Sequence, residues 1–226
     1  MRAMFTRARG ERGISLIEAM IVLLMTSILA AVAAPSISRT VAQSRLARAQ
    51  NDAQAIKTAI NNFLTEFTAF SPAAFTSDGT DSGDTIAMLV SDGDIPPLHP
   101  DIAALGAPDD NWSSYVQCCG GVNVAFLEGH LVTNTNLGAG GAYDTNAGGW
   151  RGAYISAPVD PDPWGNRYMV NVEYLRGAST SNDVFVLSAG PDEQVDTQFE
   201  FESGGAVPGD DDIISIIRRD SGATVP

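Results

Sequence analysis

The chain opens with a basic segment followed by a long apolar stretch. Residues 1–13 hold four arginines and one glutamate, and the 21 residues from Ile14 to Ala34 carry a single charge, that of Glu18. A helix of this length rises about 30 Å, which matches the hydrocarbon core of a bilayer. The arginines favour a cytoplasmic N-terminus. The pattern predicts one membrane-spanning helix, with the chain after Ala34 on the outer side of the membrane.

A secretory signal peptide would have a similar basic and apolar start, with a cleavage site in the Ala-rich end of the apolar stretch. Two features favour a retained helix. The stretch is longer than the usual hydrophobic core of a signal peptide, and Glu18 lies inside it. An ionised carboxylate at mid-membrane costs about 2.5–3.5 kcal/mol on insertion scales, so a charge there indicates a function.

Helical periodicity continues beyond the apolar stretch. Apolar residues recur at steps of three and four along one helix face, and the opposite face is polar. The apolar face consists of Leu46, Ala49, Ala53, Ile56, Ile60, Phe63, Phe67 and Phe70. Ser71-Pro72 ends the pattern, because the residue before a proline disfavours helix. The sequence therefore predicts an amphipathic helix over 36–70, continuous with the first, that packs on the protein's own sheet.

The remaining chain has short apolar segments separated by Gly-, Asp- and Asn-rich stretches. We expect a helical turn or two in Thr85–Val90 and Ile102–Leu105. A hairpin is expected in which Val122–Phe126 and His130–Thr133 flank Glu128-Gly129. Strands are expected at Met169–Tyr174, Val184–Ser188 and Ile213–Ile217. These elements predict an α+β fold, in which the long helix packs on a small antiparallel sheet.

A motif at the start of the apolar stretch is specific to one family. Arg12-Gly13-Ile14-Ser15-Leu16-Ile17-Glu18 resembles the prepilin peptidase site of the type IV pilin superfamily. The resemblance implies a pilin-like fold, cleavage after Gly13, removal of residues 1–13 as a leader peptide, and methylation of the new N-terminus at Ile14. The family usually has Phe or Met at this position, so Ile14 is a departure. Pro35 matches the helix-kinking proline that the family has beyond its membrane segment.

This cleavage would give Glu18 a charge partner. Ile14 would carry a new ammonium group, and a buried carboxylate needs an opposite charge. The two groups point apart within one helix, whereas the amine of an adjacent subunit would reach Glu18. The resemblance therefore implies a homo-oligomeric helical filament whose axial register is fixed by pairs between Glu18 and a neighbour's Ile14 amine.

A second resemblance lies towards the C-terminus. Trp150-Arg151-Gly152-Ala153-Tyr154 precedes Asp162-Pro163-Trp164-Gly165-Asn166, whose proline and glycine favour a turn. Together the two motifs are similar to the head of the major pseudopilins of type II secretion, in which Trp-x-Gly-Pro-Tyr precedes Asp-Pro-Trp-Gly-Asn. Ala153 stands where that family has proline. The resemblance covers about residues 150–192 and 210–213, and it leaves residues 71–149 without a counterpart.

In the same family, a loop after the strand binds calcium through aspartates and backbone carbonyls. Ser188-Ala189-Gly190-Pro191-Asp192 matches the start of that loop, and Asp210-Asp211-Asp212-Ile213 matches its end. The resemblance implies Asp192, Asp210 and Asp212 as calcium ligands, and oxygen ligands of this kind suit Ca²⁺. Glu193 replaces the family's glycine, and residues 194–209 lengthen the loop. An acidic loop that only keeps the protein soluble is the alternative.

The charge of the chain is unevenly spread. The 226 residues have a net charge of −14. Eight of the 13 basic residues and three of the 27 acidic residues precede residue 58, which leaves five against 24 and a net charge of −19 beyond it. So acidic a surface repels nucleic acid and excludes it as a partner of this region. The adjacent Cys118 and Cys119 are thiols, a strained vicinal disulfide, or include one cysteine that bridges elsewhere.

No catalytic constellation is evident in the sequence. The two histidines, His99 and His130, accompany neither a nucleophile motif nor a spaced Cys/His set for zinc. We therefore expect a structural subunit, not an enzyme. The two resemblances imply that it is the major pseudopilin of a periplasmic pseudopilus that drives protein export through a type II secretion system. Expected partners are prepilin peptidase, other pseudopilins and inner-membrane secretion components. The expected location is the bacterial inner membrane, crossed once, with the head in the periplasm.

This interpretation divides the chain into a leader (1–13), a transmembrane and polymerisation helix (14–35), an amphipathic helix (36–70), a variable insertion (71–149) and a C-terminal sheet with the calcium loop (150–226). Two alternatives stay open. A type IV pilus or competence pilin is expected to carry a distal disulfide loop in place of Asp-Pro-Trp-Gly-Asn. A membrane-anchored calcium-binding or adhesive module that does not polymerise has no use for Glu18.

Overall fold

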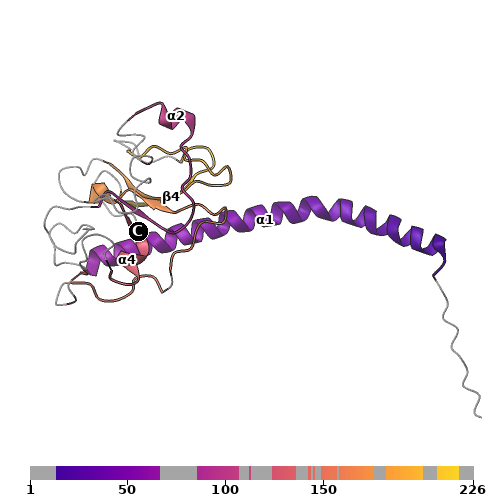
Figure 1. Cartoon of the computed structure of the whole chain (residues 1–226), viewed down its shortest axis with the longest axis horizontal. Helices are drawn as coiled ribbons and strands as arrows, with labels where there is room; N and C mark the ends of the chain where they lie inside the picture. The colour runs from indigo at the N-terminus through magenta and orange to yellow at the C-terminus, as the bar shows by residue number, and fades with distance from the viewer. Residues whose placement is uncertain are drawn as a thin grey trace, which may run out of the picture. The chain divides into compact units, whose positions relative to one another are not determined.

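The chain divides into two units, residues 1–44 and residues 45–226, of which we call the second the head. The computed structural model describes residues 14–66, 86–106, 112, 124–135, 142–143, 145, 149–156, 158–175, 182–200 and 208–218. Helix α1 (Leu16–Glu66) has 51 residues, includes Pro35, and is the longest element in Figure 1. The prediction of one long N-terminal helix is confirmed over this range. Its expected last turn, residues 67–70, lies outside the described residues.

The first unit exposes its apolar side chains. From Ile14 to Val41, every large apolar side chain is between 46% and 78% exposed. All residues of 14–44 whose burial is described are exposed. This part of the chain is long and apolar enough to span a membrane, which is consistent with a single-pass membrane protein.

The head is built on a five-stranded mixed sheet with the strand order β2-β1-β3-β4-β5. The strands are β1 (Met88–Val90), β2 (Val124–Phe126), β3 (Met169–Val170), β4 (Val184–Ser188) and β5 (Ile213–Arg218). Three of the four strand pairs are antiparallel, whereas β1 and β2 are parallel. The expectation of a wholly antiparallel sheet is therefore wrong for this pair, because β1 and β2 are joined by a long connection that contains helix α2 (Pro100–Ala103).

Several local predictions need correction. Strand β1 lies where a helical turn was expected, and helix α4 (Leu127–Leu131) follows β2 where a hairpin was expected. Leu127 and Leu131 are both fully buried, and their spacing of four places them on one helix face. Only the first two residues of the expected strand Met169–Tyr174 are strand, and the 3-10 helix η1 (Val172–Leu175) follows. The strands expected at β4 and β5 and the helical turn at α2 are confirmed.

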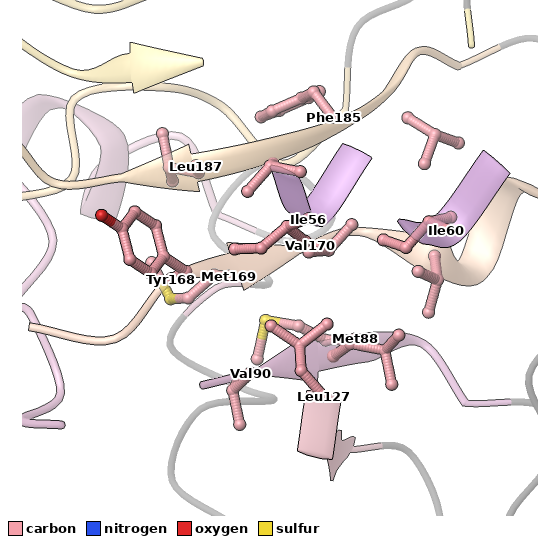
Figure 2. Packing of buried hydrophobic residues seen from close by; sticks show 14 of the residues in the cluster. Ile56, Ile60, Met88, Val90, Leu127, Tyr168, Met169, Val170, Phe185 and Leu187 are labelled. Carbon is pink, nitrogen blue, oxygen red and sulfur yellow. The ribbon is translucent and has the colours of Figure 1, made fainter. Parts of the chain in front are cut away.

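The apolar face of α1 forms one side of the core. Ile56, Ile60 and Phe63 are at most 1% exposed and belong to the same buried cluster as the strands. Figure 2 shows Ile56 and Ile60 of α1 beside Val170 of β3, with Phe185 of β4 close by. The prediction that this helix face packs on the protein's own sheet is confirmed for the described residues from Ala49 to Phe63.

The Asp-Pro-Trp-Gly-Asn segment forms the expected turn. Asp162 Oδ1 accepts hydrogen bonds from the backbone N–H groups of Trp164 (3.0 Å) and Asn166 (2.8 Å), and Gly165 takes a positive φ of 101°. Ser188 Oγ donates to Asp162 Oδ2 at 2.7 Å. Burial raises the pKa of Asp162, and these hydrogen bonds oppose the shift. Asp162 therefore ties the turn to the end of β4, where the acidic loop begins.

Candidate functional site

The processing and assembly residues lie in the first unit. Gly13 is outside the described residues, and Ile14, the expected first residue of the mature chain, is 77% exposed. Glu18 lies in the first turn of α1 and is exposed. Among the residues that the structure describes, Glu18 has no basic partner. Its carboxylate is thus presented on an apolar helix surface, four residues from the expected new terminus.

The acidic loop in the head begins where two backbone segments meet. Gly190, at the end of β4, has a φ of 67°, and a Cβ there would overlap the backbone carbonyl of Asp211. A Cβ at Gly209 would likewise overlap the backbone carbonyl of Asp196. Only glycine allows so close an approach of the chain. The two glycines therefore bring the residues after β4 against the residues before β5.

Three aspartates converge at this meeting point. Asp192, Asp196 and Asp211 each offer a carboxylate oxygen, and the three oxygens lie within 4.8 Å of one another. The N–H of Asp192 donates to Asp211 Oδ2 at 3.0 Å, and the N–H of Gln194 donates to Asp192 Oδ1 at 2.9 Å. These hydrogen bonds hold the carboxylates in place across the loop.

This cluster differs from the ligand set that the resemblance implied. Asp192 belongs to it, whereas Asp196 and Asp211 were not nominated from the sequence. Asp210 is exposed and is not in the cluster, and Asp212 is buried with its Oδ2 accepting from the N–H of Asp196 at 2.9 Å. The signal in the sequence for Asp211 was its place between two nominated aspartates. Nothing in the sequence distinguished Asp196.

Glu193 stands where the family that the chain resembles has glycine. The backbone conformation of Glu193 shows how this replacement is accommodated. Its φ is 63°, in the left-handed region that glycine favours. The loop therefore keeps a glycine-like backbone here at some cost in strain.

The electrostatics of the cluster suit a cation. Burial, followed by the charge of Asp192, raises the pKa of Asp196, and burial also raises the pKa of Asp211. Burial raises the pKa of Asp212 to about 7. The Oδ1 atoms of Asp211 and Asp212 are buried without a hydrogen-bond donor. A bound cation would offset these costs of gathering carboxylates.

The spacing of the three carboxylates is compatible with one shared cation, such as Ca²⁺. Two oxygens that bind one Ca²⁺ at about 2.4 Å lie no more than about 4.8 Å apart. The carboxylate oxygens of Asp192, Asp196 and Asp211 meet this limit. These three residues would hold the ion, which would link the chain after β4 to the chain before β5.

Residues from the region without a family counterpart support the loop. The N–H of Val195 donates to the carbonyl of Pro97 at 2.9 Å, and the N–H of His99 donates to the carbonyl of Val195 at 3.0 Å. His99 Nδ1 lies 3.5 Å from Asp196 Oδ1 and 3.6 Å from Asp101 Oδ2. The His99 side chain is 37% exposed. It therefore stands at the edge of the acidic cluster.

The second histidine, His130, has a structural role in the head. His130 is completely buried in α4, and its Nδ1 lies 2.7 Å from the hydroxyl of Tyr143. Burial lowers the pKa of His130 to about 3, so the ring is neutral at pH 7. The backbone carbonyl of His130 accepts a hydrogen bond from Trp150 Nε1 at 3.0 Å. The N–H of Tyr154 donates to the carbonyl of Leu131 at 2.7 Å, so the segment Trp150–Tyr154 is anchored on α4.

Comparisons of the chain with protein-family models, with curated proteins and with solved structures gave no match. Any assignment to a family therefore depends on features of the chain itself. These are the sequence motif around Gly13, Glu18 on the exposed part of α1, the Asp162 turn and the acidic loop.

Proposed function

We propose that this chain is a filament subunit of the type IV pilin superfamily, most similar to the major pseudopilins of type II secretion. Prepilin peptidase cuts it after Gly13, and the mature chain is held in the inner membrane until it polymerises. Its head then lies in the periplasm, within a pseudopilus that drives protein export. The observation that carries the proposal is a charged residue, Glu18, in the segment of α1 whose large apolar side chains are all exposed and which follows a prepilin-type cleavage motif.

The exposed helix needs an apolar environment. Leu23, Leu24 and Leu29 are each more than 60% exposed, as is typical of the apolar side chains in this segment. In water, each such side chain loses the roughly 1.5–3 kcal/mol that its burial would contribute. Lipid supplies the burial before assembly, and the same helix of neighbouring subunits supplies it in the filament.

Glu18 makes assembly specific. Its carboxylate is costly in lipid, by about 2.5–3.5 kcal/mol at the centre of a membrane. The ammonium group created at Ile14 carries the opposite charge and the same cost. Pairing Glu18 of one subunit with the Ile14 amine of the next removes both costs at once, and it does so only at one axial offset of the two helices.

The acidic loop gives the head a stabilising clamp in this proposal. Asp192, Asp196 and Asp211 would hold Ca²⁺, which would tie the chain after β4 to β5. Ca²⁺ supplies charge neutralisation at this point and takes no part in a reaction. The role is structural, in keeping with a subunit that functions by assembly.

The experiment that tests the proposal is an intact-mass measurement on the full chain extracted from membranes of a bacterium that makes prepilin peptidase. We expect a mature chain that begins at Ile14, heavier by one methyl group. Replacement of the small residue at the cut site, Gly13→Leu, should leave the full-length precursor in the membrane. Ser15→Ala, two residues away, serves as a control that should be processed normally.

Three results would contradict the proposal. A mature chain that begins after Ala34 would identify the N-terminus as a secretory signal peptide. An uncut chain in the presence of active peptidase would favour a plain membrane anchor that carries a calcium-binding module. A chain that is processed but forms surface filaments, instead of a periplasmic pseudopilus, would identify it as a type IV pilus or competence pilin.

A further inference from the structure

The head has a pocket that the proposed function does not use. Its volume is about 420 Å³, and it lies between the end of β1, the β2–α4 junction and residues 158–160. Phe126 and Val159 supply apolar surface, and Asp92, Glu128 and Asp160 supply carboxylates. Most of this wall comes from residues 90–135, the part of the chain for which the sequence offered no counterpart.

The carboxylates of the pocket are available to a partner. Asp92, Glu128 and Asp160 are all exposed. In the described part of the chain, neither Asp92 nor Glu128 has a basic partner. Phe126 is half-buried, and the guanidinium carbon of Arg167 lies 5.6 Å from its ring centroid. A pocket that combines apolar surface with carboxylates fits a side chain with an apolar stem and a cationic end, which is the structure of arginine.

An arginine of the chain itself already lies beside one carboxylate of the pocket. Arg48 of α1 lies 4.0 Å from Asp160, and a smaller cavity of about 120 Å³ beside Arg48 is also lined by Pro158, Val159 and Asp160. The segment 158–160 therefore separates the pocket from an arginine of the protein's own helix. Arg48 also pairs with Asp52 at 3.4 Å, so this arginine is committed within its own head.

Two further arginines on α1 are uncommitted. Arg39 and Arg45 are exposed, and no acidic residue lies between Glu18 and Asp52 in the sequence. Neither arginine has an ion pair among the residues that the structure describes. The chain beyond residue 58 carries a net charge of −19, so copies of this chain bring a basic helix segment and an acidic head into one assembly.

We infer that the pocket receives an arginine, Arg39 or Arg45, from α1 of a second copy of this chain. The guanidinium group pairs with Asp92 and Glu128, and its stem lies against Phe126 and Val159. This contact between subunits rests on the proposed polymerisation and adds to it a pairing of heads with helices, separate from the pairing of Glu18 in the membrane. Its effect is to fix which neighbour each head contacts.

Charge reversal in the full-length chain tests the inference. For each variant, sheared filaments are separated from membranes by sedimentation, and the concentration of free subunit is measured. Asp92→Lys and Glu128→Lys place a positive charge at the pocket and, because both side chains are exposed, should leave the fold intact. Each should raise the concentration of free subunit in equilibrium with filament by about fivefold, the upper range for one surface ion pair. Glu66→Lys makes the same charge change at an exposed side chain outside the pocket, and should have no effect.

The decisive step is rescue. A chain that carries Asp92→Lys and Glu128→Lys together with Arg39→Glu, or with Arg45→Glu, should assemble within about twofold of the unsubstituted chain, because all the charges of the contact are then exchanged. Normal assembly of Asp92→Lys and Glu128→Lys would overturn the inference. Impaired assembly that neither exchange restores would also overturn it, because the pocket would then serve a different partner.

The intact mass of each variant distinguishes a failure of the pocket contact from a failure of the proposed function. If all variants begin at Ile14 and the unsubstituted chain forms filaments, a failed rescue counts against the pocket contact alone. If the unsubstituted chain is processed but forms no filament, the proposed function and the pocket contact fail together.

Discussion

Both halves of α1 carry large apolar side chains, which are exposed in the first half and buried in the second. Before residue 44, every large apolar side chain is at least 46% exposed, whereas Ile56, Ile60 and Phe63 are at most 1% exposed. The second half satisfies its apolar residues with its own sheet. The first half has no such partner among the described residues, so its apolar surface requires lipid or other copies. Substitutions in the two halves should therefore change different quantities: stability of the head in one, assembly in the other.

The largest effect on stability is expected at Phe63. This side chain is fully buried, with ring centroids 5.3 Å from Tyr143 and 5.6 Å from Tyr154. Phe63→Ala should lower the free energy of unfolding by about 3–5 kcal/mol, because it removes apolar contacts and leaves a cavity. Urea unfolding of the full chain in detergent, followed by aromatic fluorescence, measures the change.

The control for Phe63 lies in the other half of the same helix. Leu24 is 62% exposed, so Leu24→Ala should change the unfolding free energy of the head by less than about 0.5 kcal/mol. Equal losses for the two substitutions would remove the distinction between the two halves of α1.

The extent to which the fold follows from the sequence can be seen in these elements. The apolar face of α1 was predicted because the helix is long enough to show a period of 3.6 residues. Strand β4 was predicted because it is a continuous apolar run. Strand β1 has three residues, Met88–Val90, and no period can be recognised over so short a length. The parallel pairing of β1 and β2 depends on the path of a long connection, which local pattern does not encode.

The next largest effect is expected from calcium. If Ca²⁺ binds the folded head and not the unfolded chain, a hundredfold excess over Kd should stabilise it by about 2.7 kcal/mol. The full chain in detergent should therefore melt at a higher temperature in millimolar Ca²⁺ than in chelator. Asp196→Asn and Asp211→Asn should abolish the difference, because both carboxylates belong to the converging set.

Asp210 provides the matched control for the calcium loop. It is adjacent to Asp211 and exposed, but it lies outside the cluster of three, so Asp210→Asn should retain most of the calcium effect. Equal melting in Ca²⁺ and in chelator for the unsubstituted chain would remove the metal from the account. It would leave the assembly of the first unit unaffected.

In the acidic loop, one residue of the cluster was predicted from the sequence and another could not be. Asp192 was found because it directly follows a strand and matches a motif. Asp196 lies in the part of the loop that has no counterpart in the family. It reaches the cluster because Gly209 lets the chain approach its backbone closely and because Val195 pairs with Pro97 and His99. The contacts of Val195 with Pro97 and His99 span about 100 residues of sequence, so no local pattern indicates them.

A smaller, pH-dependent effect is expected from His130. Its pKa is lowered to about 3 in the folded head, while an unfolded histidine has a pKa of about 6.5. The unfolded chain therefore binds the proton more tightly, and stability falls as pH decreases from about 6.5 towards 3. The slope for this one group is at most about 1.4 kcal/mol per pH unit.

The contribution of His130 is obtained as a difference between two chains. Buried carboxylates such as Asp162, whose pKa is raised, change stability in the opposite direction with pH. The difference in unfolding free energy between the unsubstituted chain and His130→Asn removes this common background. That difference should shrink as pH is lowered from 7 to 5, and a constant difference would show that His130 is not buried in its neutral form.

The central claim, that the exposed half of α1 assembles through Glu18, is tested most directly by competition between two subunits. The unsubstituted chain and Glu18→Val are produced together, and mass spectrometry measures the ratio of the two in sheared filaments and in the membrane pool. Removing one partner of a buried ion pair costs about 3–5 kcal/mol, whereas valine inserts into the membrane more readily than glutamate. We predict that Glu18→Val is depleted from the filaments by at least about tenfold relative to the membrane. Equal ratios in the filaments and the membrane would contradict the account.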